Sequence, residues 1–218
     1  MTSAYPRSDE RRRMVEHQIE ARGIRDKRVL AAMRDVPRHL FVPSPYDRDA
    51  YADAPLPIGN GQTISQPYIV ALMTTLLHPT PTGTVLEIGA GSGYQAAVLS
   101  ALVRKVITVE RIEKVAALAR ANLAAVSADN VKIIIGDGTL GYAAGGPYNG
   151  IIITAATPEI PVPLKEQLAE GGRLVAPVGD RILQELVVFE RHGDRFPEER
   201  HGGVRFVPLI GEHGWEEI

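Results

Sequence analysis

The chain has 218 residues, of which 44% are apolar and 23% are charged, so it can bury a sizeable core and is not a disordered chain. It carries 24 basic and 26 acidic residues, a formal charge of −2, which argues against a basic surface that binds a nucleic-acid backbone. The absence of cysteine excludes disulfides, thiolate nucleophiles and cysteine-bound metals.

We expect a cytoplasmic protein with one domain over residues 1–218. The chain becomes highly charged after Pro6 without the apolar core of a signal peptide. No apolar run approaches the roughly 18 residues of a membrane span. A chain without cysteine fits a reducing compartment.

The N-terminal part of the chain predicts two short helices and a loop. An apolar stripe of helical period indicates a helix over residues 8–22, which Gly23 ends. A second helix is expected over residues 26–36, before a proline. Residues 41–61 are rich in proline and glycine but carry apolar anchors, so we expect an ordered loop, and loops of this length are usually functional.

From residue 66 onward, helical stretches alternate with β-branched runs. We expect helices over residues 66–79, 94–102, 112–127 and 163–169, and strands over residues 84–88, 105–110, 131–135 and 150–154. This alternation predicts an α/β fold with a parallel, doubly wound sheet and helices on both faces. Further strands over residues 172–178, 183–190 and 205–209 follow without helices between them, so we expect an antiparallel C-terminal strand.

A glycine-rich turn follows the first strand of this sheet. Residues 89–93 read Gly-Ala-Gly-Ser-Gly, which lets the backbone turn sharply and lets a ligand approach the main chain. The turn departs from the dinucleotide fingerprint because Tyr94 stands where the last glycine belongs. Glu87 would repel a pyrophosphate and attract an ammonium or sulfonium group. Taken alone, a tight turn without a ligand explains the glycines equally well.

Two more acids follow the next two strands. Glu110 lies about 20 residues after the glycine turn, where a carboxylate can accept from ribose hydroxyls, although an acid at a helix start is an equal alternative. Asp137 can accept from a purine amine, although Asp-Gly is most often a turn. Together these groups lie at the carboxyl edge of one sheet, and their spacing resembles that of class I methyltransferases dependent on S-adenosylmethionine.

The methyl acceptor depends on other segments. Residues 154–158 after the fourth strand are small and lack the proline and aromatic character with which enzymes hold a flipped base. Methylation of nucleic-acid bases is therefore disfavoured. The acceptor needs space beside a small, nearly neutral wall.

The segment before the first sheet strand carries a specific resemblance. Residues 56–68, which contain Thr-Ile-Ser-Gln-Pro, resemble the active-site segment of protein-L-isoaspartate (D-aspartate) O-methyltransferases, which repair isomerised aspartyl residues. Residues 85–94, 136–138, 171–179 and 205–209 resemble the same family in the same order. The resemblance therefore spans nearly the whole chain, from about residue 14 to residue 209.

This resemblance implies a Rossmann-like class I methyltransferase fold. An N-terminal helical and loop segment, residues 7–80, would cover the active site, and residues 81–210 would form the cofactor-binding sheet core. The implied reaction moves a methyl group from S-adenosylmethionine to the free α-carboxylate of L-isoaspartyl residues in damaged proteins and peptides. S-adenosylhomocysteine is the product, and the ester then collapses to a succinimide. Acceptance of D-aspartyl side chains stays open, and no metal, nucleic-acid or membrane partner is implied.

The resemblance also implies roles for individual positions. Ser65 matches the catalytic residue, and Thr63, Ser65 and Val207 match substrate contacts. Cofactor contacts are implied for Gln62, Thr63, Ile64, Glu87, Gly89, Gly91, Glu110, Arg111, Asp137 and Gly138. Among these, Glu110 is expected nearest to the ribose. Asp137 and Gly138 are expected near the adenine, and Gly89 and Gly91 near the methionine moiety.

The implied acceptor needs no general base. An α-carboxyl has a pKa of about 3.3–3.7 and is ionised at neutral pH. We accordingly expect surface or capping positions for the histidines, which are His17, His39, His78, His192, His201 and His213. The Ser65 hydroxyl can aim one carboxylate oxygen without stabilising the ground state as an arginine would, and it can also cap the following helix.

Three alternatives stay open at the level of sequence. They are a methyltransferase acting on a small molecule or another carboxylate, a nicotinamide-dependent oxidoreductase, and a binding module without activity. Tyr94 argues against the second, and the presence of Ser65, Glu110 and Asp137 argues against the third. No apolar stripe is left over after the core is assigned, so we expect a monomer.

Overall fold

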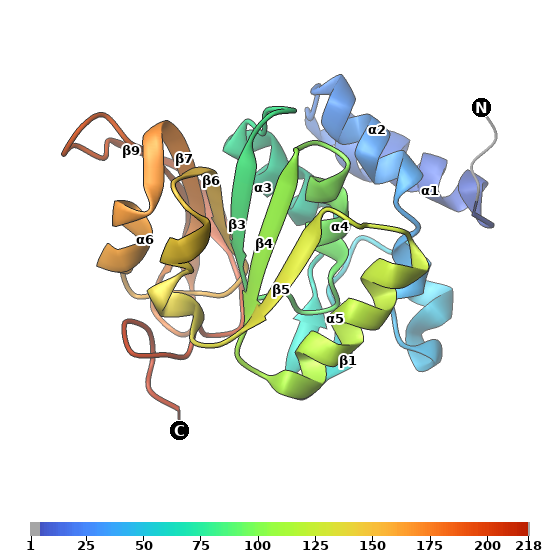
Figure 1. Cartoon of the computed structure of the whole chain (residues 1–218). Helices are drawn as coiled ribbons and strands as arrows, with labels where there is room; N and C mark the ends of the chain where they lie inside the picture. Colours follow the sequence, from blue (N-terminus) through green and yellow to red (C-terminus); the bar gives the residue numbers. More distant parts are fainter. Residues whose placement is uncertain (1–4, 218) are drawn as a thin grey trace.

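A seven-stranded sheet forms the centre of the protein, for which a computed structural model describes residues 5–217 (Figure 1). Its strands lie in the order β5-β4-β3-β6-β7-β8-β9. Their bounds are β3 (Thr84–Ile88), β4 (Lys105–Glu110), β5 (Val131–Ile135), β6 (Tyr148–Ile153), β7 (Leu168–Gly179), β8 (Gln184–Glu190) and β9 (Glu198–Val204). The strands from β5 to β7 pair in parallel, and β8 is antiparallel to both of its neighbours. The expected mostly parallel sheet with an antiparallel C-terminal part is confirmed.

Both faces of the sheet are buried, which explains the near-continuous apolar runs of its strands. Val85, Val106 and Ile152 pack in one apolar cluster, whereas Leu86, Ile107 and Ile151 pack in a second one. Neighbouring residues of one strand therefore belong to opposite cores, as the two-residue period of a strand requires.

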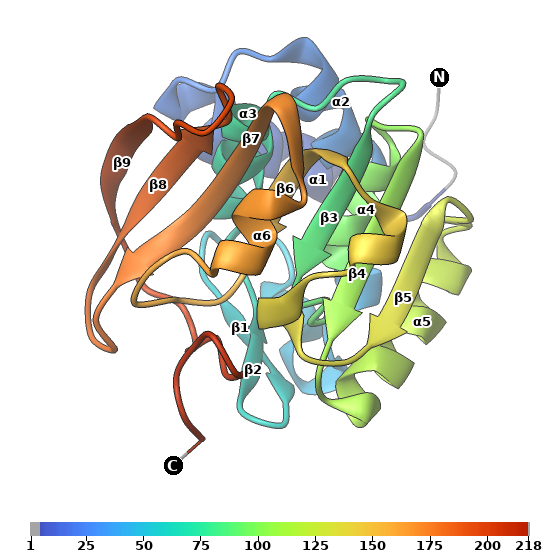
Figure 2. The ribbon, with the colours of Figure 1, turned by 60° about the vertical axis from the view of Figure 1, so that its left-hand side comes forward.

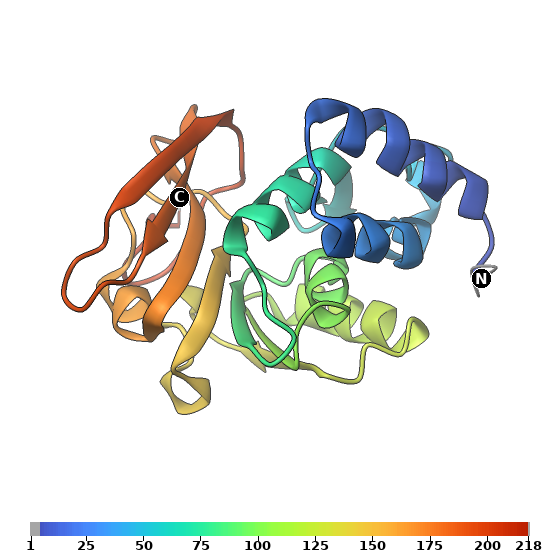
Figure 3. The same ribbon diagram turned by 90° about the horizontal axis from the view of Figure 1, so that it is seen from above.

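Helices cover the two faces unequally. In Figure 2 the short helix α6 (Val162–Glu166) lies in front of the sheet, and the other labelled α-helices lie behind it. Three of these follow the sheet strands or lead into them: α3 (Pro67–Leu77), α4 (Tyr94–Ser100) and α5 (Glu113–Ala125). The helices α1 (Ser8–Met14) and α2 (Lys27–Asp35) form an outer layer that packs against α3 and α4 (Figure 3).

The first predicted helix is continuous but irregular. After α1 the chain makes a π-helical turn, Val15–Ile19, and a 3-10 turn, Glu20–Arg22. Gly23 then ends the segment with a φ of 97°, as expected of a glycine at this position. A periodic apolar stripe does not distinguish these variants from a regular helix, because all of them keep one face against the core.

The expected loop over residues 41–61 contains regular structure. Besides the 3-10 turns Arg38–Phe41 and Ser44–Asp49, it includes β1 (Leu56–Gly59), which pairs with β2 (Gln62–Ile64). The turn between them is Asn60-Gly61, with positive φ angles of 53° and 70°. These angles are those of the tight turns that favour Asn-Gly in two-residue hairpins.

The C-terminal part of the structure differs from the expectation in three places. The last strand is β9 rather than residues 205–209, which leave the sheet and cross its carboxyl edge. There the Ala156 amide donates to the Val207 carbonyl over 2.7 Å, and the Leu209 amide donates to the Ala156 carbonyl over 2.7 Å. Pro208 between them has no N–H for a continuous ladder. The helix expected over residues 163–169 also ends at Glu166, and β7 begins at Leu168 instead of residue 172.

A buried arginine holds the segment between α2 and β1 in place. The Arg38 guanidinium donates from Nε to the Ala50 carbonyl over 2.8 Å and from Nη2 to the Ala54 carbonyl over 3.5 Å. It lies 5.0 Å from the centre of the Tyr94 ring at the start of α4. Burial lowers the pKa of Arg38 to about 10, so the group is still charged at neutral pH.

We expect Arg38→Met to destabilise the protein, because the two carbonyls lose their charged donor and no other donor within residues 5–217 bonds them. The free energy of unfolding should fall by about 2–3 kcal/mol. Urea denaturation would measure it. Arg48→Met, at an exposed position of the same segment, is the control and should change stability little. Equal midpoints for the two variants would contradict this role.

Candidate active site

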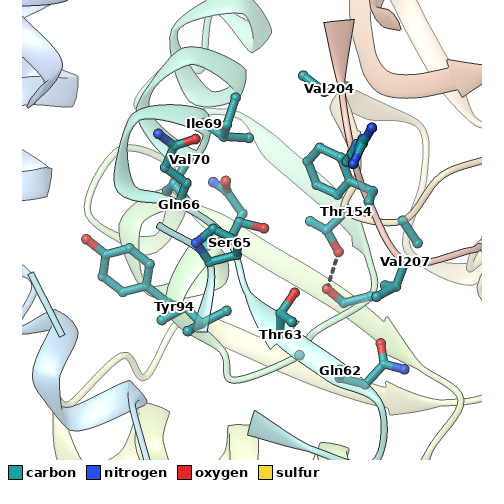
Figure 4. Close-up of a pocket in the computed structure, with 18 of the residues that line it drawn as sticks. Gln62, Thr63, Ser65, Gln66, Ile69, Val70, Tyr94, Thr154, Val204 and Val207 are labelled. Carbon is teal, nitrogen blue, oxygen red and sulfur yellow. Dashed lines mark hydrogen bonds between the residues drawn. The ribbon is translucent and has the colours of Figure 1, made fainter. Parts of the chain in front are cut away.

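A cavity of about 850 Å³ opens at the carboxyl edge of the parallel strands. It lies where the chain order reverses, since β4 pairs with one side of β3 and β6 pairs with the other. Open α/β sheets bind ligands at such switch points. The lining segments are β2 with the start of α3, the glycine turn after β3, the end of β6, and residues 203–207 (Figure 4).

A smaller cavity of about 220 Å³ adjoins the first. Gly138, Leu209 and the backbone after β4 contribute to its walls. The two cavities share five lining residues, which are Gln62, Gly89, Glu110, Ala155 and Val207. The sequence-predicted residues Gln62, Gly89, Glu110, Gly138 and Val207 are thus brought together around one continuous, two-part site.

The glycine turn is shaped by a threonine that follows β6. The Thr154 hydroxyl donates to the carbonyls of Ile88 over 2.9 Å and of Gly89 over 2.7 Å. A side chain on Gly89 would meet this hydroxyl at 2.5 Å, so only glycine allows the contact. Gly91 lines the large cavity with a φ of 53°. A side-chain carbon at this position would lie in ordinary contact with Ile58 Cδ1 at 3.8 Å, and without it a ligand can approach the backbone.

Glu110 connects the turn to the end of β4. Its Oε2 accepts from the Gly91 amide over 3.1 Å, and its Oε1 accepts from the Ile112 amide over 3.0 Å. The side chain is 6% exposed and lines both cavities. A carboxylate with two fixed backbone donors still has free lone pairs toward the cavity, which suits a neutral diol and not a pyrophosphate. Arg111 lines the smaller cavity and forms an ion pair with Glu217 at 2.6 Å.

The Ser65 hydroxyl faces the large cavity. The N-cap of α3 is Gln66 and Pro67 follows at its first position, so the capping alternative for Ser65 is wrong. Within residues 5–217 no hydrogen bond occupies the Ser65 side chain. Thr63 and Ile64 line the same cavity, and Thr63 lies across from Thr154 and Val207 (Figure 4). Ile64 is only 3% exposed and also packs into the core.

Glu87 lies apart from the residues discussed so far. It lines neither of the two cavities, and it is fully buried. Its carboxyl oxygens have no hydrogen-bond partner among the described residues, and Thr108, its register partner on β4, has an equally unpartnered hydroxyl. Burial raises the pKa of Glu87 to about 8; the neighbouring Thr108 hydroxyl opposes this shift, and the Glu110 charge adds a smaller increase. A neutral carboxyl cannot attract a cation, so a cofactor contact of Glu87 stays a prediction.

This burial predicts a pH-dependent stability. The folded pKa of about 8 exceeds the ordinary value of 4.5, so the folded protein binds a proton that the unfolded chain releases between these pH values. The stabilisation is complete below pH 4.5 and is lost as the pH rises through 8. Its slope is at most about 1.4 kcal/mol per pH unit.

We expect Glu87→Gln to remove this slope from the pH dependence of the unfolding free energy, measured by denaturant titration from pH 5 to pH 9. Glu113→Gln, at an exposed helix start, should keep the slope of the parent protein. A parallel pH profile for parent and Glu87→Gln would show that Glu87 is ionised in the folded state.

Asp137 is held by the C-terminal tail. Its Oδ2 accepts from the Glu212 amide over 2.8 Å, and its Oδ1 accepts from the amide and the hydroxyl of Thr139 over 2.8 and 2.7 Å. Burial alone would raise the pKa of Asp137, but these hydrogen bonds lower it below the ordinary value. Its neighbour Gly138 lines the smaller cavity, whereas Asp137 lines neither part of the site. The adenine contact of Asp137 stays a prediction.

The tail approaches Asp137 closely enough to require a glycine. A side chain at Gly211 would lie 2.1 Å from Asp137 Oδ1, so Gly211→Ala must displace the carboxylate or the tail. If Asp137 contributes to the cofactor site, we expect about tenfold weaker binding of S-adenosylhomocysteine, the effect of one lost charged hydrogen bond. Calorimetry would measure it. Gly136→Ala, with no atom within 4 Å, is the control, and equal affinities would separate Asp137 from the site.

The mouth of the large cavity includes residues that the sequence did not reveal. Arg22 lies 3.4 Å from the centre of the Tyr68 ring and forms an ion pair with Asp53 at 3.1 Å. His201, expected at a surface or capping position, instead lines the cavity from β9, as does Arg205 after it. These residues come from distant segments, and no local motif marks them. Among residues 5–217 no cluster of three or more histidines and acids could hold a metal ion, and no helix is long and apolar enough to cross a membrane.

Comparison with known proteins identifies the class. The chain matches the family model described as protein-L-isoaspartate(D-aspartate) O-methyltransferase over residues 9–214. It is 71% identical to a protein-L-isoaspartate O-methyltransferase of Methanoregula boonei, covering 99% of this chain and 100% of that one. It is 62% identical to the enzyme of that name from Methanospirillum hungatei, covering 97% and 98%.

A solved structure agrees with these relatives. The Plasmodium falciparum protein described as a β-aspartate methyltransferase, in complex with S-adenosyl-L-homocysteine, superposes with a TM-score of 0.78 at 26% identity. The match covers 90% of this chain and 96% of that one. The sheet order and the site thus define a class I methyltransferase. The chain belongs to the protein-L-isoaspartate(D-aspartate) O-methyltransferase family.

Family membership confirms the expected enzyme and its methyl donor, S-adenosylmethionine. The reaction is the transfer of a methyl group to isoaspartyl carboxylates of damaged proteins. The nicotinamide-dependent oxidoreductase and the inactive binding module are no longer competing interpretations.

Proposed function

We propose that the large cavity holds the α-carboxylate of an L-isoaspartyl residue against Ser65. The observation that carries this proposal is the Ser65 hydroxyl, which faces the cavity without any hydrogen-bond partner in the described part of the chain. Thr63 and Val207 line the same space, in keeping with their expected contacts to substrate. The small residues Thr154 and Ala155 leave room for a peptide main chain beside them.

The cofactor is proposed to extend from the large cavity into the smaller one. Gly89 and Gly91 would border the methionine moiety, and Gln62 and Ile64 would line its other side. Glu110 would accept from the ribose hydroxyls with the lone pairs that Gly91 and Ile112 leave free. Gly138, with Asp137 and Arg111 nearby, would border the adenine. Support comes from the lining of the two cavities, the larger of which Gly91 borders.

The residues of this site suit a reaction in which charge disappears. S-adenosylmethionine supplies an electrophilic methyl group on a cationic sulfur. The acceptor carboxylate is already ionised at neutral pH, so no side chain needs to remove a proton. A single hydroxyl at Ser65 aims one carboxylate oxygen without the strong ground-state stabilisation that an arginine fork would add. The surrounding apolar side chains exclude water and favour a neutral product.

The remaining features of the proposal concern partners and place of action. We propose a cytoplasmic monomer that acts on isoaspartyl proteins and peptides and has no nucleic-acid or membrane partner, with residues 7–80 covering the site as part of a single domain. The near-zero net charge supports the proposed absence of a nucleic-acid partner. D-aspartyl residues would need a separate assay.

The decisive test is methyl transfer from labelled S-adenosylmethionine to a peptide with one L-isoaspartyl residue, compared with its L-aspartyl twin. Only the isoaspartyl peptide should form a base-labile ester. We expect Ser65→Ala to lower kcat/KM by about 10- to 100-fold, the effect of one orienting contact, with unchanged affinity for S-adenosylhomocysteine.

The matched control is Ser100→Ala, which removes a hydroxyl that bonds the Ala97 carbonyl within α4, away from both cavities. It should keep the parent activity. Undiminished activity in Ser65→Ala would remove the proposed role of this hydroxyl. Transfer to neither peptide, despite tight cofactor binding, would favour a small-molecule acceptor.

A further inference from the structure

The protein contains two Asn-Gly pairs in contrasting surroundings. Asparagine followed by glycine is the sequence most prone to deamidation, because the unhindered glycine nitrogen can attack the asparagine side-chain carbonyl. The pairs are Asn60-Gly61 and Asn149-Gly150. The chain's other two asparagines, Asn122 and Asn130, precede leucine and valine, whose side chains hinder this attack.

Asn60-Gly61 forms the exposed tip of the β1–β2 hairpin. Both residues are exposed, and no atom lies within 4 Å of the position that a side chain on Gly61 would take. In the described part of the chain, no hydrogen bond restrains the Asn60 side-chain amide. The hairpin has only two short strands, so opening its tip disrupts few contacts.

Asn149-Gly150 is locked into the central sheet. Gly150 is buried in β6 and pairs with Val85 on one side and Arg173 on the other. The Asn149 side-chain oxygen accepts from the Thr84 amide over 2.9 Å. Deamidation here needs the central sheet to open, which costs much more free energy than fraying a hairpin tip.

We propose that Asn60 deamidates spontaneously and that the L-isoaspartyl residue formed there is a substrate for a second copy of this enzyme. In the first step the Gly61 nitrogen bonds to the Asn60 side-chain carbon, and ammonia leaves as the succinimide closes. Water then opens the ring at the main-chain carbonyl. The chain now runs through the side-chain carbon, and the α-carboxylate is free.

An isoaspartyl residue at position 60 would distort the hairpin that forms one wall of the site. An isoaspartyl residue adds one carbon to the main chain and one negative charge to a turn that pairs Gly59 directly with Gln62. Gly61 and Gln62 line the smaller cavity; Thr63 follows in β2, and Ser65 comes directly after that strand. A change of register at residue 60 therefore displaces the residues proposed to hold cofactor and substrate.

Repair has to come from another molecule. Residue 60 is at the outer end of the hairpin, and the β2 strand between it and Ser65 is itself a wall of the site. The isoaspartyl carboxylate cannot enter a cavity bounded by its own strand. In a second copy, transfer of the methyl group to this carboxylate oxygen leaves S-adenosylhomocysteine. The Gly61 nitrogen then displaces methanol and restores the succinimide.

The first measurement is deamidation itself, which does not depend on activity. Purified protein is aged at pH 7.4 and 37 °C without cofactor, and fragment mass spectrometry follows isoaspartate at both pairs. We expect residue 60 to accumulate it at least about tenfold faster than residue 149. Equal rates at the two pairs would overturn the proposal.

The second measurement tests repair in trans. Aged Ser65→Ala chains serve as substrate for a small amount of fresh parent enzyme and labelled S-adenosylmethionine. Label should enter the aged chains faster when fresh enzyme is added than in its absence, because Ser65→Ala chains keep only a small residual activity. It should be lost from an aged Asn60→Gly, Ser65→Ala chain, since Gly-Gly keeps the positive φ angles of the turn. Asn149→Ser in the same background is the matched control and should take up label normally.

The proposal rests on the proposed function, so an isoaspartyl peptide is assayed alongside. If the peptide is methylated but the aged chain is not, repair of residue 60 is overturned. If neither is methylated, the proposed function itself fails, and the mass measurement still decides whether residue 60 deamidates. Undiminished label in the Asn60→Gly chain would place the damage elsewhere and overturn the proposal.

Discussion

The site depends on the reversal of chain order at the carboxyl edge of the sheet. Because β4 and β6 pair with opposite sides of β3, the loops that follow them run in opposite directions. A crevice opens between these loops, and the glycine turn after β3 borders it. The Thr154 hydroxyl closes the base of this crevice by bonding the carbonyls of Ile88 and Gly89. This contact joins the two halves of the sheet at the point where ligands bind, and it leaves no room for a side chain at position 89.

Segments remote in sequence complete the crevice. The hairpin of β1 and β2 supplies one wall, and the extended residues 205–209 supply the opposite one. Each is tied down elsewhere: the segment before the hairpin by buried Arg38, and the extended residues by backbone hydrogen bonds to Ala156. Contacts outside the site therefore hold its two walls in place. Damage at the hairpin tip would reach the cavities through the same connection.

Much of the fold follows from the sequence, because strands buried on both faces need long apolar runs and helices need periodic ones. The wrong expectations concern segments whose structure is set by the chain around them. The strands β1 and β2 are too short to show a period, although Asn60-Gly61 is a hairpin signal that could have revealed them. The stretch at 205–209 has strand composition, but Pro208 and the edge of the sheet direct it across the carboxyl ends.

The sequence by itself determined the order of helices and strands from residue 66 to residue 190, the enzyme family and the short segments that carry Ser65, the glycine turn and Glu110. These depend on local pattern and on motifs with fixed spacing. Tertiary structure alone decided which of these groups share a cavity. It brought His201 and Arg22 to the mouth, buried Glu87 away from it, and engaged Asp137 with the tail. Burial and hydrogen bonding arise from residues far apart in the chain, and no local pattern records them.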